Sequence, residues 1–322
     1  MARQLTLLIG LALLLVAGVA VSLVLGVAEA SDDVVRLRAI RAVLAALAGA
    51  GLAVAGVLTQ GLFRNPLAGP SILGTTAGAA FGGQFSLLTH GLLVSVVPWM
   101  VPELLLPIGC ALGAGLALVL LMGLTARSRS ALTVLLVGFV LSSLFASLGA
   151  LVTSLSQSSW ELGRAVVVFS LGSLDGKGLV HVALALPLIV IGIAASWTWA
   201  RDLDLLLAGR DEARSLGVSV ERTQTWILVW VAMLTAAAVA VGGGVAFVGL
   251  VVPHALRPFA GVAHRRLLPA SILGGAAYVV WCDVVARAFP AIGEVPLGVV
   301  TGLVGIPVFV MIFRRSEREA GA

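Results

Sequence analysis

Long apolar runs separated by short polar segments dominate the chain. Many runs reach about 17–25 residues, the length that an α-helix needs to cross about 30 Å of hydrocarbon. The pattern predicts about ten transmembrane helices, at about 5–27, 41–63, 68–88, 103–125, 132–153, 177–199, 223–243, 245–261, 268–288 and 296–313. The amphipathic segment 160–174 is expected to lie at the membrane interface.

Composition supports this interpretation. Hydrophobic residues make up 60% of the 322 residues and charged residues only 11%, against about 25% charged residues in soluble domains. Many runs are rich in Gly, Ala and Ser, as in 42–57, which allows helix backbones to approach closely. We therefore expect an all-α integral membrane protein, folded as one compact transmembrane domain over residues 1–322.

The N-terminal run has an alternative interpretation. The run 5–27 is followed by Ala28 and Ala30, which resembles a signal peptide and its cleavage site. Because the run exceeds the usual ~7–15 apolar residues of a signal peptide, we expect a retained first span. Cys110 and Cys282 lie in different apolar segments, so buried free thiols are expected, and no metal site.

Basic residues orient the chain. With the N-terminus inside, the cytoplasmic side carries fourteen of the 20 Lys and Arg residues, which predicts that both termini are cytoplasmic. Six basic residues lie outside, against this trend: Arg36, Arg38, Arg41, Arg164, Lys177 and Arg287.

A polar stretch, QGLFRNPLAGPSILG, interrupts two apolar runs at residues 60–74. Pro66 lacks a backbone donor and disfavours helix at Asn65, so the preceding helix should end there. The Asn65 side chain can hydrogen-bond the freed backbone, which predicts a tight turn over Asn65, Pro66, Leu67 and Ala68.

Three segments together carry a family resemblance. They are residues 60–82 around that turn, the charged segment 205–224 (LLLAGRDEARSLGVSVERTQ), and 242–275 (GGGVAFVGLVVPHALRPFAGVAHRRLLPASILGG) with its continuation at 282–289 and 294–315. In order and spacing they resemble the permeases that import iron-siderophores, haem and cobalamin in bacteria. Those permeases are the membrane subunits of type II binding-protein-dependent ABC importers.

The segment 200–222 is expected to be a cytoplasmic coupling loop. Gly209 and Gly217 bracket a short amphipathic helix, and Gly217 suits a left-handed C-cap. The resemblance implies that this helix docks on an ATP-binding subunit through Arg210, Asp211, Glu212, Ala213, Arg214, Ser215, Leu216 and Gly217. The chain has no G-x-x-x-x-G-K-[ST] phosphate loop, so ATP and Mg²⁺ are expected on partner subunits, with no cofactor and no enzymatic activity in this chain.

The resemblance also implies roles for other residues. Arg38, Arg41 and Arg287 are expected to dock an acidic substrate-binding protein, with interfacial snorkelling of their side chains as the alternative. The cytoplasmic gate is expected at Ser130, Ala131, Leu132 and Thr133. Asp283 lies four residues before Arg287, which predicts a structural ion pair within one helix; proton coupling by Asp283 is the alternative.

The expected protein is a permease of the bacterial cytoplasmic membrane that carries an iron-siderophore complex. Cobalamin or haem is the alternative cargo, and an ion-coupled secondary transporter is the alternative class. Expected partners are a second permease chain, identical or paralogous, two ATP-binding subunits, a periplasmic or lipid-anchored substrate-binding protein and membrane lipid, but no nucleic acid.

Overall fold

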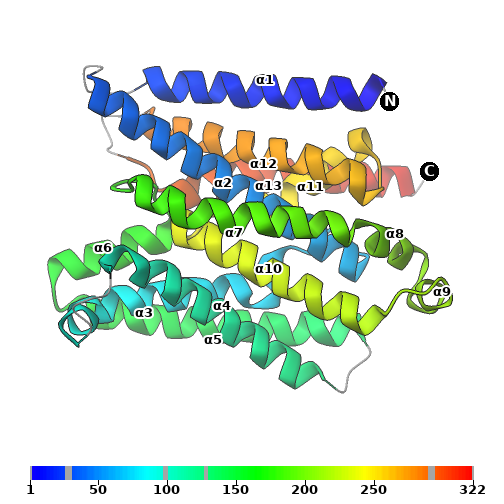
Figure 1. Cartoon of the computed structure of the whole chain (residues 1–322), viewed down its shortest axis with the longest axis horizontal. Helices are drawn as coiled ribbons and strands as arrows, with labels where there is room; N and C mark the ends of the chain where they lie inside the picture. The colour runs from blue at the N-terminus through cyan, green and yellow to red at the C-terminus, as the bar shows by residue number, and fades with distance from the viewer. Residues whose placement is uncertain (1, 26–30, 97–100, 127–129, 289–293, 321–322) are drawn as a thin grey trace.

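The computed structural model describes residues 2–25, 31–96, 101–126, 130–288 and 294–320, and this part of the chain contains helices and connections but no strand. The helices are α1 Ala2–Val24, α2 Asp32–Phe63, η1 Pro70–Leu73, α3 Thr75–Val96, η2 Pro102–Leu104, α4 Leu105–Thr125, α5 Ala131–Ser156, α6 Trp160–Leu171, α7 Leu179–Thr198, α8 Ala200–Ala208, α9 Arg210–Ser215, α10 Val220–Gly242, α11 Val248–Ala260, α12 His264–Arg287 and α13 Leu297–Ala320. The long helices run roughly side by side, with α1 at one edge of the bundle and α5 at the other (Figure 1). The all-α prediction is confirmed.

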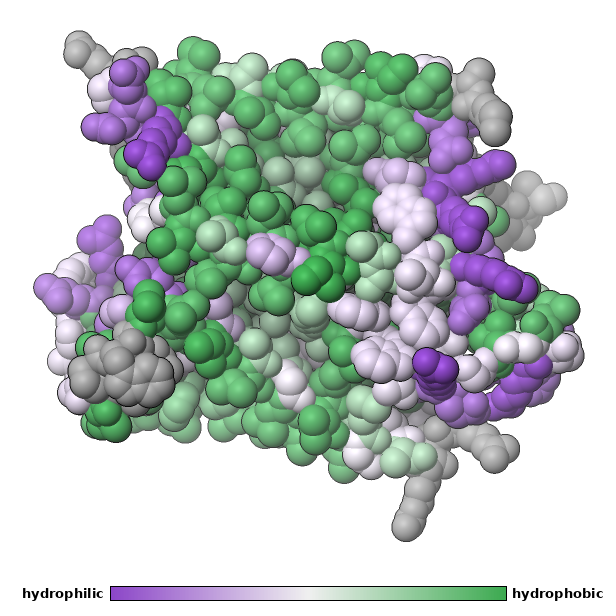
Figure 2. Space-filling view, viewed as in Figure 1, coloured by the Kyte–Doolittle hydropathy of each residue, from purple (hydrophilic) through white to green (hydrophobic). Residues whose placement is uncertain are grey.

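Eight of the described helices are long and apolar enough to cross a membrane: α1, α2, α3, α4, α5, α7, α10 and α12. The other two predicted spans are shorter. Helix α11 has 13 residues, or about 20 Å, and the apolar part of α13 is Leu297–Met311. An apolar band separates two polar ends of the molecule, as expected for a multi-pass membrane protein (Figure 2).

Helix α2 forms the centre of the bundle. It begins at the N-cap Ser31, whose Oγ accepts a hydrogen bond from the Val34 amide, and Asp32 and Asp33 occupy its first turn. Acidic residues there oppose the positive end of the helix dipole. The helix therefore starts well before the predicted residue 41. It is buried along most of its length and packs against α10 and α12.

Glycine pairs allow α2 to approach its neighbours closely. Gly49 meets Gly275 of α12, and Gly56 meets Gly249 of α11. A Cβ atom on Gly56 would lie 1.8 Å from the Gly249 carbonyl oxygen. This contact confirms the close backbone approach expected from the small residues of the apolar runs.

Irregular backbone joins α10 to α11 inside the bundle. Gly243 and Phe247 have positive φ angles, 66° and 64°. The Gly244 amide donates to the Phe169 carbonyl at the end of α6 (3.2 Å), and the Ala246 amide donates to Thr301 Oγ1 of α13 (3.3 Å). Non-helical backbone is tolerated at membrane depth where protein surrounds it. Helix α6 thus ends against buried backbone rather than lying wholly at the interface.

Helix α1 packs against α12 as part of the same bundle. The Trp281 indole N–H donates to the Leu14 carbonyl across this contact (3.0 Å). Cys110 and Cys282 are both buried free thiols, as predicted. The N-terminal helix is therefore integrated into the fold through its neighbour α12.

Candidate functional site

The predicted turn after α2 is present. Arg64 adopts a left-handed conformation (φ 52°) that ends the helix, and its amide hydrogen-bonds to carbonyls of the last turn. Asn65 Oδ1 then accepts from the Leu67 amide (2.9 Å), while the Ala68 amide donates to the Asn65 carbonyl (3.0 Å). Pro66 ends the helix, and the Asn65 side chain then gives the Leu67 amide a hydrogen-bond acceptor.

The short helix η1 follows this turn and meets α5. Ser142 Oγ donates to the Ser71 carbonyl (2.9 Å). A Cβ on Gly138 would lie 2.4 Å from the Ile72 carbonyl oxygen, so η1 rests directly on the α5 backbone. The turn therefore places the backbone of η1 in direct contact with α5.

The predicted coupling loop contains two helices, α8 and α9. Gly209 (φ 143°) joins them and Gly217 (φ 87°) ends the second, which confirms the predicted left-handed C-cap. Ala213 is fully buried, whereas the side chain of Leu216 is 58% exposed. One face of α9 thus anchors it to the bundle and an exposed apolar residue projects from its end.

Polar contacts fix the orientation of α9. Arg210 hydrogen-bonds to Gln224 of α10, and Arg214 contacts both Asp211 (3.0 Å) and Glu221. The hydrogen bond to Glu221 raises the pKa of Arg214 above its ordinary value. These contacts connect α9 to the first turns of α10.

A second contact holds α8 against α12. Asp204 Oδ1 accepts from the His264 backbone amide (2.8 Å) and lies 2.6 Å from His264 Nδ1. Burial opposes ionisation of Asp204, but the His264 hydrogen bonds outweigh it and lower the pKa of this carboxyl. The predicted coupling loop is therefore attached to both α10 and α12.

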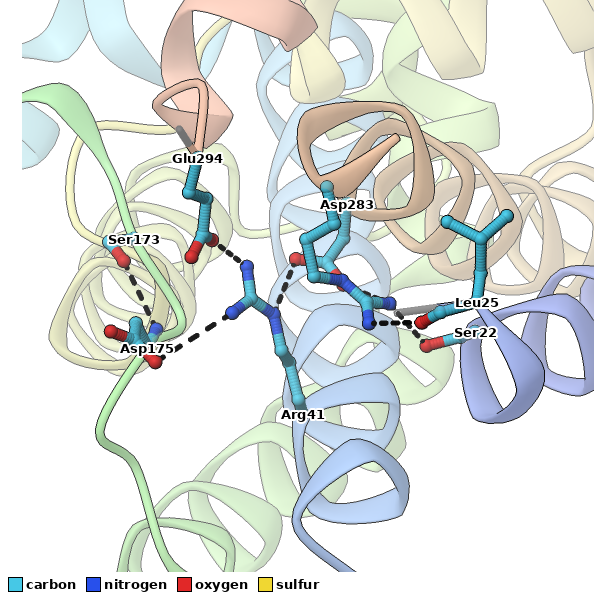
Figure 3. Close-up of polar contacts among 8 residues, drawn as sticks. Ser22, Leu25, Arg41, Ser173, Asp175, Asp283 and Glu294 are labelled. Atoms are coloured by element: carbon cyan, nitrogen blue, oxygen red, sulfur yellow. Dashed lines mark hydrogen bonds and ion pairs between the residues drawn. The ribbon is translucent and has the colours of Figure 1, made fainter. Parts of the chain in front are cut away.

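At the opposite end of the bundle, Arg41 lies at the centre of an acidic cluster. Its Nε donates to Asp283 Oδ1 (2.8 Å), its Nη2 contacts Glu294, and its Nη1 lies 4.0 Å from Asp175 (Figure 3). Asp283 is 1% exposed as a side chain, Glu294 35% and Asp175 77%. The cluster thus runs from a buried carboxylate to the exposed surface at this end of the bundle.

The predicted pair of Asp283 and Arg287 is also present. Arg287 Nε donates to Asp283 Oδ2 (3.1 Å), and its Nη2 donates to Ser22 Oγ (2.7 Å). Arg38 is buried and donates to the Leu23 carbonyl at the end of α1 (2.9 Å). Arg38, Arg41 and Arg287 therefore all hold contacts within the chain. Docking of a binding protein by these arginines stays a prediction.

Sequence reasoning missed the partners of Arg41. Glu294 and Asp175 lie in connections far from Arg41 along the chain, so no local spacing links them to it. The only signal in the sequence is that Asp175 and Glu294 are acidic residues close to the end of an apolar run. Within the described residues, no group of three or more His, Cys, Asp or Glu side chains could hold a metal ion.

The predicted gate falls at the start of α5. Ser130 precedes the helix, Ala131 begins it, Leu132 is 75% exposed and Thr133 is partly buried. The side chain of Ala131 and residues 127–129, from the connection that leads into the gate, lie outside the described part. The gating role of these residues stays a prediction.

Comparison with known proteins covers almost the whole chain. The model of the FecCD transport family matches residues 4–315. The cobalamin import permease BtuC of Halobacterium salinarum is 38% identical over 286 residues, 88% of this chain and 74% of the relative. The Fe(3+) dicitrate permease FecD of Escherichia coli is 39% identical over 277 residues, 86% of this chain and 83% of the relative.

A solved structure agrees with this placement. An inward-facing transporter assigned to the metal-chelate type of ABC transporter superposes with a TM-score of 0.85 at 30% identity, covering 97% of this chain and 99% of its own. The superposition therefore spans nearly every described element of the fold. The chain therefore belongs to the FecCD transport family and is the transmembrane permease subunit of an ABC importer.

Proposed function

We propose that this permease translocates an iron-siderophore complex across the bacterial cytoplasmic membrane, with both termini on the cytoplasmic side. The observation that carries the proposal is the similarity, over 86% of the chain, to a permease for a ferric chelate. A cobalamin permease is nearly as similar, so cobalamin is the second candidate cargo and haem the third.

The α8–α9 loop is the proposed docking element for an ATP-binding subunit. Leu216 is an exposed apolar residue that a partner could cover, and the buried Ala213 holds its helix against the bundle. Basic residues concentrate in the connections at this end of the bundle, which supports the placement of the loop in the cytoplasm. Two such subunits would bind ATP and Mg²⁺ and drive alternating access.

A second permease chain, identical or paralogous, completes the proposed pathway. Helix α5 exposes Ser143, Ser147 and Ser154 together with apolar residues such as Phe139. A row of hydroxyl groups on an exposed face suits a water-filled passage better than lipid. The passage would lie between the α5 helices of two copies, with the proposed gate at Ser130 to Thr133 at its cytoplasmic mouth.

The outer end of the bundle is the proposed docking surface for an acidic substrate-binding protein. Arg41 reaches this surface through partners that are themselves exposed, Glu294 and Asp175. Carboxylates of the binding protein would compete with these two residues for the Arg41 guanidinium. Attraction between opposite charges would mainly speed association.

The cargo is tested by uptake into proteoliposomes that hold the complete complex and its own binding protein. We expect ATP-dependent accumulation of a ferric-siderophore complex, with little accumulation of cobalamin or haem added at the same concentration. Accumulation of cobalamin without the ferric complex would replace the first candidate with the second. Uptake without ATP would contradict both.

A further inference from the structure

An apolar groove lies between α4, α7 and α10. It encloses about 280 Å³ and is lined by Ala111, Gly115, Leu184, Leu188, Ala232 and Met233 among others. His181 is the one ionisable side chain among its lining residues. Leu188 lines the groove and is 40% exposed, and the face of the molecule on which α7 lies is largely apolar (Figures 1 and 2). Membrane lipid surrounds such a face.

A second cavity, the chamber, adjoins the groove. Its volume is about 250 Å³, and its lining combines Ser86, His90, Glu103 and His181 with four apolar residues. His181 lines both cavities, so the two are neighbours. A chamber of mixed lining at the end of α3 and the start of α4, continued by an apolar groove deeper in the bundle, suits an amphiphile.

The chamber offers hydrogen-bond donors on one side. The Gly178 amide donates to His181 Nδ1 (3.2 Å), which leaves the proton of the neutral ring on Nε2 as a free donor. Ser86 of α3 lines the same chamber and carries a hydroxyl donor.

The chamber also offers one carboxylate. Glu103 of η2 is exposed and lies within electrostatic reach of His181. A ligand that satisfies both sides carries an anion and a cation that can donate hydrogen bonds. A phosphoethanolamine headgroup has both; a phosphocholine cation has no N–H, and a phosphoglycerol headgroup has no cation.

We propose that the chamber and groove bind one phospholipid with a primary-amine headgroup. Its phosphate accepts from His181 Nε2, its ammonium pairs with Glu103, and one acyl chain enters the groove between α4 and α7. The groove lies between α4, α7 and α10, so the site is separate from the proposed transport passage along α5.

Native mass spectrometry of the purified permease tests this proposal. The protein is equilibrated with equal amounts of phosphatidylethanolamine, phosphatidylcholine and phosphatidylglycerol that carry identical acyl chains. We expect one tightly held phosphatidylethanolamine, retained about tenfold over the other two, the ratio that one hydrogen bond to a charged group supplies. Equal retention of the three lipids would overturn the proposal.

Two matched pairs of variants locate the site. Gly115 and Gly123 both belong to α4 and both have open space where a Cβ would lie, but only Gly115 lines the groove. Gly115→Leu should abolish lipid retention and Gly123→Leu should preserve it. Equal retention by these two variants would exclude the groove as the acyl-chain site.

The headgroup contact is tested at the surface, where folding is not at risk. Glu103→Ala should reduce the preference for phosphatidylethanolamine over phosphatidylcholine to about one, because the ammonium N–H groups lose their acceptor. Glu161→Ala, on the exposed first turn of α6, should keep the preference. A Glu103→Ala protein with an unchanged preference would exclude the proposed headgroup position.

Discussion

Asp283 is the negative charge around which two arginines of the outer cluster are arranged. Its 1% exposed side chain accepts hydrogen bonds from Arg41 and Arg287, which are themselves only 12% and 13% exposed. The contact with Arg287 follows from a spacing of four residues on one helix, and the sequence predicted it. The contact with Arg41 joins α12 to α2, and no local pattern encodes it.

Removal of the Asp283 charge should destabilise the permease strongly. Asp283→Asn leaves two buried guanidinium groups with one fewer counter-charge, and loss of one partner of a buried ion pair costs about 3–5 kcal/mol. Thermal unfolding in nanodiscs measures this loss. Asp175→Asn is the control, because this 77% exposed residue lies 4.0 Å from Arg41 and should contribute at most about 1 kcal/mol.

The same variant separates a structural role of Asp283 from proton coupling. If the carboxylate only pairs with arginines, the protein that remains folded should transport with an unaltered pH dependence. Transport that lost its pH dependence in Asp283→Asn would contradict the structural role.

At the scale of helices, hydropathy predicted the spans better than it predicted their ends. The predicted third span began at residue 68, whereas α3 begins at Thr75, because a turn and η1 occupy the intervening residues. Pro66, Gly69 and Pro70 marked this interruption in the sequence. The early start of α2 was also encoded, by Ser31 and two aspartates. The helix pairs in contact could not be predicted from local patterns, because each glycine pair joins residues that lie far apart in the sequence.

The glycine contact between α2 and α11 gives a prediction of its own. Gly56→Ala should lower stability by about 1–3 kcal/mol, because its methyl group would overlap the Gly249 carbonyl and force the helices apart. Gly10→Ala in α1 meets nothing within 4 Å and should leave stability unchanged or slightly raised. Melting temperatures of the two variants compare these effects. Equal melting temperatures would show that the α2–α11 contact is not tight.

Helix α9 is tested by a charge at its exposed end. Leu216→Asp should keep the melting temperature, because the side chain is 58% exposed, yet prevent co-purification of the ATP-binding subunit. Val262→Asp places the same charge on another exposed apolar residue, 64% exposed, in the connection between α11 and α12. Full co-purification with Leu216→Asp would exclude Leu216 as a docking contact.

In the assembled transporter, one face of α5 is proposed to meet water and the exposed face of α7 to meet lipid. Ser147 lies on the exposed face of α5, and Ile191 of α7 is 53% exposed. A membrane-impermeant thiol reagent should label Ser147→Cys in the assembled transporter and leave Ile191→Cys unlabelled. The native cysteines are buried and should add little background. Equal labelling of both variants would contradict a passage along α5.

The central claim is that this permease couples a binding protein on one side of the membrane to ATP hydrolysis on the other. Its most direct test is the ATP hydrolysis rate of the complete complex in nanodiscs, measured with and without the ligand-loaded binding protein. We expect the ligand-loaded binding protein to stimulate hydrolysis. A hydrolysis rate that is the same with and without the binding protein would contradict it.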